Sequence, residues 1–181
     1  MSLPRIAPAE APYSPEVQTA FDRVMRGAPP LLLFRSVARN PRVLERMMAG
    51  GLLDRGSIPL RLRELIILRT TARCGAEYEW GVHVAAYGKP SAWTPAELVA
   101  TRQVPSDPSA WPPAEALAIA LTDALHERSD IDDALWNELK QVYADEQLIE
   151  MIMLAGLYHA VSYLCRSLRL PPEPGAPRFA A

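Results

Sequence analysis

Hydrophobic residues along this chain recur with the spacing of helices, and almost no segment alternates with the period of a strand. The first expected helix follows Ser14, where Pro15 and Glu16 supply a first-turn proline and an acidic first turn. It ends at Gly27, and the arm before Pro15 is expected to be extended. This opening pattern predicts a helix over residues 15–26.

Prolines, glycines and capping residues divide the rest of the chain into further helical segments. The expected helices span 31–40, 42–53, 59–74, 77–87, a short stretch after Thr94, 114–129, 132–144 and 145–170. The proline-rich tail 171–181 is expected to be irregular. Together these segments predict an all-α protein, a single-domain helical bundle of about eight or nine helices.

Composition narrows the class of protein. The 181 residues are 49% hydrophobic with a formal net charge of −2, which argues against disorder and against nucleic-acid binding. No apolar run approaches the roughly 20 residues of a membrane span, and residues 1–15 lack the apolar core of a signal peptide. The two cysteines give no sign of a disulfide framework. We therefore expect a soluble, cytoplasmic protein without membrane or nucleic-acid partners.

The segment 61–89 carries the residues best suited to chemistry. Glu64 lies in a hydrophobic run on one expected helix, and a buried carboxylate is costly without a partner. Glu79 and His83 lie four residues apart on the next helix, so their side chains share a face and can touch. A tight turn at Gly75 would fold the two helices together and bring Glu64 to the same pocket. Two carboxylates and one imidazole suffice for general acid–base catalysis, so this trio is the candidate catalytic set.

Each member of the trio also has a purely structural interpretation. Glu79 can simply cap its own helix, and a single histidine such as His83 is more often a packed core residue than a catalyst. From spacing alone, a structural ion pair of Glu64 with Arg61 or Arg69 is the more common arrangement. The spacing therefore makes the trio a candidate and leaves these alternatives open.

Neighbouring residues are candidates for binding a substrate. Trp80 and Tyr78 flank Glu79 and can wall a small pocket, although aromatic residues at such places more often belong to the core or to an interface. Arg69 offers a guanidinium that suits the two oxygens of a substrate carboxylate. These three side chains complete the candidate site.

No metal or cofactor site is visible in the sequence. The three histidines lie far apart along the chain, and no spacing of cysteine and histidine fits a zinc site. His126 is typical of a surface position near a helix end, whereas His159 either packs in the core or reaches the pocket from another helix. No metal, flavin or nicotinamide is therefore expected.

The segment 61–84, RLRELIILRTTARCGAEYEWGVHV, resembles the carboxymuconolactone decarboxylase family, which also contains the alkylhydroperoxidase D-like proteins. The ending LYHAVSYLCRSLRLPPEPGAP is similar to the carboxyl terminus of many decarboxylase-like members. The resemblance implies a helical domain over 41–161, preceded by an arm and helices over 1–40 and followed by the helix end and tail over 162–181. It also implies a homo-oligomer, a trimer or hexamer, with active sites close to subunit contacts.

The family's peroxidase branch has a glutamate, a Cys-x-x-Cys pair that begins twelve residues later, and a histidine four residues after the second cysteine. Here Glu64 and His83 keep their places, but Ala76 and Glu79 stand where the cysteines would be. Thiol peroxidase chemistry needs a thiolate and a resolving partner, so the resemblance is to the decarboxylase-like branch. A peroxidase that uses Cys74 instead stays an alternative.

The resemblance implies a cofactor-free lyase that removes carbon dioxide from a small carboxylated lactone or a similar oxo-acid, as in the degradation of aromatic compounds. His83 would protonate the resulting carbanion, with Glu79 orienting it and Glu64 as a second acid–base group. The substrate would be held by Tyr78, Trp80 and Arg69. The competing interpretations are an alkylhydroperoxidase-like peroxidase or antioxidant protein and a non-catalytic oligomeric ligand-binding protein.

Overall fold

The computed structural model describes residues 4–179, and in that part of the chain helices are joined by loops without any strand. The elements are α1 (Pro15–Met25), α2 (Leu32–Val37), α3 (Pro41–Ala49), α4 (Leu60–Arg73), α5 (Glu77–Tyr87), α6 (Pro95–Ala100), the 3-10 helix η1 (Pro108–Ala110), α7 (Pro113–Arg128), α8 (Asp133–Val142) and α9 (Asp145–Ser167). The nine α-helices of the described part confirm the expected all-α fold.

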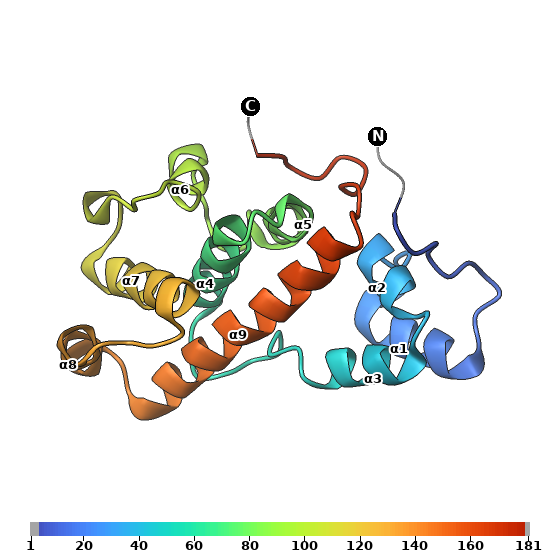
Figure 1. Ribbon diagram of the computed structural model, residues 1–181, viewed down its shortest axis with the longest axis horizontal. Coiled ribbons are helices and arrows are strands. Elements are labelled where there is room, and N and C mark those ends of the chain that lie inside the picture. Colours follow the sequence, from blue (N-terminus) through green and yellow to red (C-terminus); the bar gives the residue numbers. More distant parts are fainter. Residues whose placement is uncertain (1–3, 180–181) are drawn as a thin grey trace.

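The long helices build the centre of the molecule. α9 crosses the middle of the view, with α4 and α5 above it (Figure 1). α4 packs against α5, α7 and α9, and α7 in turn contacts α8. The short helices α1, α2 and α3 stand together on the right of the view, where α3 packs against both α1 and α2. This arrangement leaves α9 between the amino-terminal helices and the rest of the bundle.

α4 is buried on every side. All residues from Leu62 to Thr71 are buried, because α5, α7 and α9 surround the helix. A helix enclosed in this way is expected to be hydrophobic all round, and the run Leu65–Leu68 satisfies that expectation. The charged residues Glu64 and Arg69 flank this run, and neither side chain is exposed to solvent. Both side chains therefore need charged or hydrogen-bonding partners inside the protein.

A glycine turn returns the chain from α4 to α5. Gly75 has a φ of +64°, a left-handed conformation that costs glycine little, and it follows directly on the last residues of α4. The amide of Ala76 then donates to the carbonyl of Thr71, which closes the turn. Glycine ends the helix here, as the sequence predicts. The turn lays α5 against α4, so residues of the two helices face each other.

α9 corrects one expectation from the sequence. Its 23 residues are long and apolar enough to cross a membrane by length and composition, whereas we had expected no apolar run of that kind. The helix instead buries one face in the protein, through Leu148, Met151, Leu154, Ala155, Tyr158, Val161, Ser162 and Cys165. Its apolar character is that of a central core helix.

The tail after α9 has no regular structure as far as residue 179, but it is held in place by side chains. The carboxylate of Glu173 accepts hydrogen bonds from the Tyr78 hydroxyl at 2.6 Å and from the Leu32 amide at 2.5 Å. At Gly81 on α5 a Cβ atom would lie 2.4 Å from the carbonyl oxygen of Pro177, so only glycine allows this close approach. The tail thereby covers part of α5.

Candidate active site

Glu64 is paired on both carboxylate oxygens. Arg63 donates from Nε and Nη2 to Oε1 at 2.9 and 2.8 Å. His83 Nδ1 lies 2.7 Å from Oε2. The expected ion pair of Glu64 with Arg61 or Arg69 is wrong, since both of those arginines bind acidic residues on other elements. The turn between α4 and α5 brings Glu64 and His83 together instead.

His83 is fixed through both ring nitrogens. Its Nε2 atom lies 3.0 Å from the hydroxyl oxygen of Tyr158 on α9 and 3.4 Å from Oε1 of Glu79. Glu79 is one helical turn before His83 on α5, as the spacing predicted. The ring of Tyr158 also packs edge-on against the imidazole, with 5.0 Å between centroids. The structure therefore brings Glu64, Glu79 and His83 into one buried cluster.

The charges of the cluster balance. Burial lowers the pKa of His83, but the hydrogen bonds to Glu64 and Glu79 outweigh burial and raise the pKa to about 9. His83 is thus an imidazolium at neutral pH. Two cations, Arg63 and His83, then face two carboxylates, which is the condition for keeping four charged groups out of water.

The hydroxyl of Tyr158 stays protonated next to this cluster. Burial, and then the negative charge of Glu79, raise the pKa of the Tyr158 phenol well above its usual value of 10.0. Because the imidazolium of His83 donates its Nε2 proton, the phenol oxygen accepts that bond and keeps its own proton for another acceptor. Tyr158 is therefore a neutral phenol beside a buried cation, and its hydroxyl hydrogen remains available for donation.

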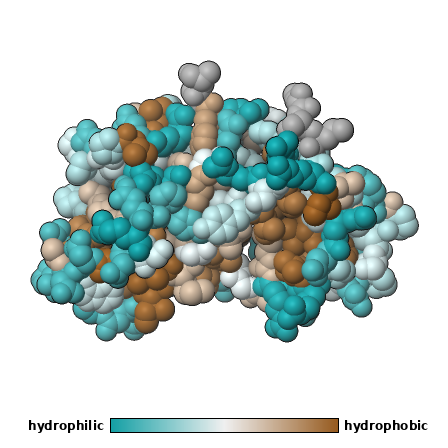
Figure 2. Space-filling model, viewed as in Figure 1, coloured by the Kyte–Doolittle hydropathy of each residue, from teal (hydrophilic) through white to brown (hydrophobic). Residues whose placement is uncertain are grey.

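One wall of a cavity of about 540 Å³ is formed by this cluster. Its polar lining comes from Glu79, His83, Tyr87, Tyr158 and Glu173. Most of the remaining lining is apolar and includes Met25 on α1, Phe34 on α2, Met47 and Met48 on α3, and Leu157 and Val161 on α9. Figure 2 shows hydrophobic surface on this side, right of the centre, over α1 and α2 beside α9. Within residues 4–179, no arginine or lysine side chain lines the cavity.

Arg69 does not belong to this site. Its guanidinium grips Asp123 on α7 with two hydrogen bonds of 2.7 and 2.6 Å. It also donates to the carbonyl oxygens of Thr101 and Gln103 at 3.0 and 2.6 Å. Fully buried and occupied on every side, Arg69 joins α4 to α7 and to the loop after α6, and the expectation that it binds substrate is corrected.

Trp80 and Tyr78 also lie outside the cavity. Trp80 packs in a small cluster with Leu68 and Val84 and donates from Nε1 to the hydroxyl of Thr101. Tyr78 directs its hydroxyl to Glu173 of the tail. Both rings pack on faces of α5 other than the one that carries Glu79 and His83. Both residues pack next to the site without lining the cavity, contrary to the sequence-based interpretation.

Sequence reasoning missed Arg63 and Tyr158. A signal for Tyr158 existed, because it falls in the buried stripe of α9, one residue before the histidine that the sequence made conspicuous. Arg63 carried no comparable signal, because it is one of three arginines near Glu64 in the sequence. In the folded protein it also donates to the carbonyl oxygen of Leu53 at 2.7 Å, a contact that the sequence does not reveal.

The thiols do not join this site as a pair. Cys165 Sγ lies 3.9 Å from a carboxylate oxygen of Glu79, but the side chain is buried and does not line the cavity. Burial, and then Glu79, raise the pKa of the Cys165 thiol strongly. Cys74 faces a different pocket, and burial raises its pKa too. Neither sulfur has the environment of a reactive thiolate.

Comparison with known proteins places this geometry in a family context. A model of the carboxymuconolactone decarboxylase family matches residues 40–123, which contain Glu64, Glu79 and His83. No curated protein matches the chain in sequence. Similar solved structures do exist, at sequence identities that speak to the fold alone.

An uncharacterized peroxidase-related protein from Ralstonia eutropha with an alkylhydroperoxidase D core is similar at a TM-score of 0.81 and 15% identity, over 96% of this chain and 94% of that chain. A peroxidase-related protein from a Silicibacter species has a TM-score of 0.77 at 15% identity, over 97% of both chains. The debrominase Bmp8, solved with 2,3,4-tribromopyrrole, has a TM-score of 0.74 at 18% identity, over 94% and 92%. Residues 40–123 therefore match the carboxymuconolactone decarboxylase family, and the chain shares the fold of these alkylhydroperoxidase D-like, peroxidase-related structures.

Proposed function

We propose that this chain is a cofactor-independent carboxy-lyase of the decarboxylase-like kind, acting on a small carboxylated lactone or a similar oxo-acid. The observation that carries the proposal is His83, an imidazolium held between two carboxylates and a tyrosine hydroxyl at the wall of an apolar cavity. Loss of carbon dioxide from such a substrate leaves an enolate. This reaction requires a hydrogen-bond donor that stabilises the developing enolate oxygen, and a proton donor for the carbon that has lost carbon dioxide.

In the first step, the substrate carbonyl oxygen accepts the phenolic hydrogen of Tyr158. The bond between the carboxylate carbon and the adjacent carbon breaks, and its electron pair moves into the conjugated carbonyl to give the enolate. Carbon dioxide leaves neutral into the apolar part of the cavity, where a carboxylate is poorly solvated and its loss of charge is favoured. The imidazolium of His83 stabilises the phenol–enolate hydrogen bond from behind.

In the second step, the carbon is protonated. His83 supplies the proton from Nε2, and Glu79, which lines the cavity 3.4 Å from that nitrogen, carries it to the carbon. One solvent proton restores the cluster, so the net reaction consumes a carboxylate and a proton and yields carbon dioxide. We assign the two carboxylates roles opposite to those suggested by the sequence: Glu64, bonded to Nδ1, orients the imidazole, and Glu79, which lines the cavity, is the acid–base group that faces the substrate.

The cavity lining favours a substrate with a single carboxylate and an apolar body. A second carboxylate would need an arginine or lysine partner, and the lining contributed by the described residues contains none. Methionines on α1 and α3 supply an adaptable apolar wall instead. We therefore propose a monocarboxylated lactone or oxo-acid as substrate in preference to a dicarboxylate such as carboxymuconolactone.

The peroxidase alternative has weaker support. A thiol peroxidase needs a low-pKa thiolate, whereas burial raises the pKa of both Cys74 and Cys165. The two residues also belong to different parts of the structure, one at the end of α4 and the other buried in α9. An acid–base function accounts for the positions of Glu64 and Glu79 around His83 and needs no thiol.

The test is carbon dioxide release from a series of oxo-acids and lactones that differ in carboxylate number. The parent chain is compared with Tyr158→Phe and His83→Gln, with circular dichroism to check folding. Release from a monocarboxylated substrate that falls in both variants is the expected result. Peroxide turnover that disappears in Cys74→Ser, without any carbon dioxide release, would support the peroxidase alternative. Tight ligand binding without turnover would favour a binding protein.

We also propose that the chain acts as a homo-oligomer. The solvent side of α9 carries an exposed stripe at helical spacing, made of Ile149, Met153, Gly156, Ala160 and Tyr163. Three of these are large hydrophobic residues that are 59 to 65% exposed, an unusual gathering on one helix of a water-soluble protein. Covering this stripe with a second copy of the chain would remove that surface from water.

A further inference from the structure

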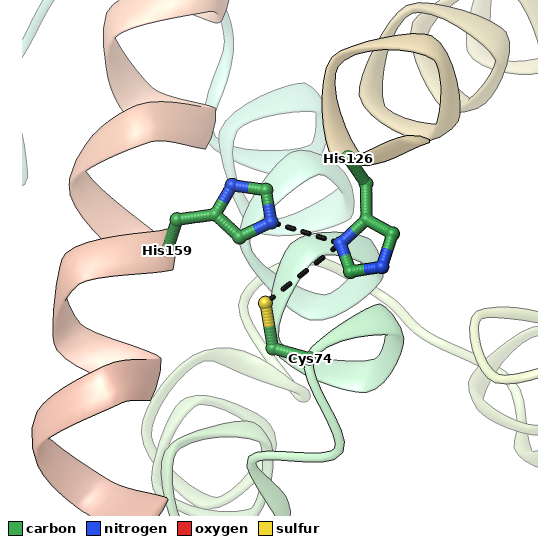
Figure 3. A group of neighbouring side chains, drawn as sticks. All are labelled: Cys74, His126 and His159. Carbon is green, nitrogen blue, oxygen red and sulfur yellow. Dashed lines mark hydrogen bonds between the residues drawn. The ribbon is translucent and has the colours of Figure 1, made fainter. Parts of the chain in front are cut away.

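A second group of chemically competent side chains lies on a different side of α9. Figure 3 shows Cys74 at the end of α4, His126 in the last turn of α7 and His159 on α9 pointing toward one another. Nδ1 of His126 is 2.9 Å from Nε2 of His159 and 3.9 Å from the sulfur of Cys74. All three donor atoms lie within 4.8 Å of one another.

These separations approach those of a metal's ligand shell. Zinc bound to nitrogen at roughly 2.0–2.1 Å and to sulfur at about 2.3 Å sets tetrahedral nitrogen–nitrogen and nitrogen–sulfur separations of about 3.3 and 3.6 Å. Two of the three observed separations, 2.9 and 3.9 Å, differ from these by less than 0.5 Å, and the third, between Cys74 and His159, lies within 4.8 Å. Small rotations of three side chains would therefore be enough to complete such a shell.

The surroundings also suit a cation. The group lines a pocket of about 550 Å³, in which all three side chains are only half-buried and a small ion can enter. Two arginines line the same pocket. Arg73 is compensated by Glu127 at 2.6 Å and by Asp123 at 3.5 Å. Arg166 donates from Nη1 to the carbonyl oxygen of Cys74 at 2.6 Å. Three ligands with solvent access on the remaining side is the arrangement of an open zinc site.

A hydrogen bond between two neutral imidazoles is the competing explanation. It accounts for the 2.9 Å contact of His126 with His159, because one nitrogen can donate and the other accept. It does not account for the thiol of Cys74, which adds a third donor of a different kind to the same point. Thiolate and imidazole together are the donors that zinc prefers.

We propose that Cys74, His126 and His159 bind one Zn²⁺ ion, with solvent in the fourth position. Binding releases the thiol proton of Cys74, so the ligand set carries one negative charge. The ion would tie the ends of α4 and α7 to the middle of α9. No zinc motif is visible in the sequence because His126 is 52 residues from Cys74 and 33 from His159, and only the fold brings them together. This proposal stands against the expectation of no metal.

The test uses the full-length chain after treatment with a chelator. Titration with Co²⁺ is expected to give a thiolate-to-cobalt charge-transfer band and the d–d bands of a four-coordinate ion at one ion per chain. Zn²⁺ should displace the cobalt, raise the melting temperature and slow alkylation of Cys74. The charge-transfer band should vanish in Cys74→Ser, and His126→Gln and His159→Gln should each weaken binding at least tenfold.

The chain provides its own controls. It holds two cysteines and three histidines, so Cys165→Ser and His83→Gln remove the remaining candidates and should keep the cobalt spectrum. Absence of a stoichiometric ion would overturn the proposal. So would a charge-transfer band that survives in Cys74→Ser, or alkylation of Cys74 that zinc leaves unchanged. Each readout is independent of carbon dioxide release, so the fate of the proposed function does not decide this one.

Discussion

The hydroxyl oxygen of Tyr158 lies 3.0 Å from Nε2 of His83, the ring nitrogen that faces away from Glu64. This contact joins α9 to the cluster on α4 and α5 and sets a buried imidazolium behind a hydroxyl at the cavity wall. If the hydroxyl stabilises the enolate, its removal affects the transition state more than the ground state.

Tyr158→Phe is therefore expected to lower kcat by roughly 100-fold, the loss typical of one oxyanion donor, with little change in KM. The ring and its packing remain, so the melting temperature should stay close to that of the parent. Steady-state kinetics and a thermal melt decide this. An unchanged kcat would remove Tyr158 from the mechanism.

The charge of His83 predicts how stability depends on pH. The folded-state pKa of about 9 lies above the ordinary value of 6.5, so the imidazolium contributes stability that is fully present below pH 6.5. That contribution is lost as the pH rises through about 9. His83→Gln lacks it and leaves buried carboxylates with one fewer cation, which should lower the melting temperature at neutral pH.

The measurement is the difference in melting temperature between parent and His83→Gln from pH 6 to pH 10. The gap should be widest at the acidic end and narrow through about pH 9. A gap that stays constant over this range would mean that the pKa of His83 is the same in the folded and the unfolded protein.

Substitution of Arg69 distinguishes a structural role of this residue from a role in substrate binding. Arg69→Met removes the two hydrogen bonds to Asp123 and leaves two backbone carbonyls without their donor. The free energy of unfolding should fall by about 3–5 kcal/mol, as for other broken buried ion pairs. KM, measured where the variant is still folded, should not change. A raised KM with unaltered stability would return Arg69 to the substrate.

The apolar lining predicts that an added cation changes substrate preference. Met47 lines the cavity from α3, and Met47→Arg places a guanidinium where the described lining has none. The ratio of kcat/KM for a dicarboxylated to a monocarboxylated lactone should rise about tenfold, the effect of one charged hydrogen bond. Met47→Leu is the matched control and should leave the ratio unchanged, while a ratio unaffected by arginine would contradict the proposed substrate position.

The exposed stripe on α9 predicts the effect of charge on assembly. Met153→Glu combined with Ile149→Glu should shift the chain toward the monomer in light scattering after gel filtration, because charge is costly in a covered apolar contact. Gln103→Glu adds one negative charge at an exposed position away from α9 and should not change the mass. A parent chain that is already monomeric at micromolar concentration would argue against the proposed oligomer.

Much of the fold could be predicted because local signals and tertiary packing agree. The capping residue Ser14 with Pro15 begins α1, and Thr94 forms a capping box with Glu97 at the start of α6. One boundary that failed lies beside glycines: the helix expected over 42–53 ends at Ala49, before two successive glycines. Helix propensity alone does not determine at which of several weak helix-terminating residues a helix ends.

The site was predicted less completely, for a physical reason. Glu79 and His83 share a helix, and helical spacing alone was enough to pair them. Arg63 and Tyr158 are selected by contacts between elements far apart in the chain, which no periodicity within one helix reveals. Arg69 and Trp80 looked available because the sequence does not show that Asp123 and Thr101 already occupy them.

Tyr158 and His159 are consecutive residues, yet the first faces the cavity and the second faces the cysteine–histidine group. Successive helical residues point about 100° apart, so α9 acts as a partition between two chambers. Because α9 lines both pockets, a movement of this helix that changes the shape of one pocket also changes the shape of the other. If occupation of one side shifts α9 and so alters affinity on the other, the effect must be reciprocal and of the same factor in both directions.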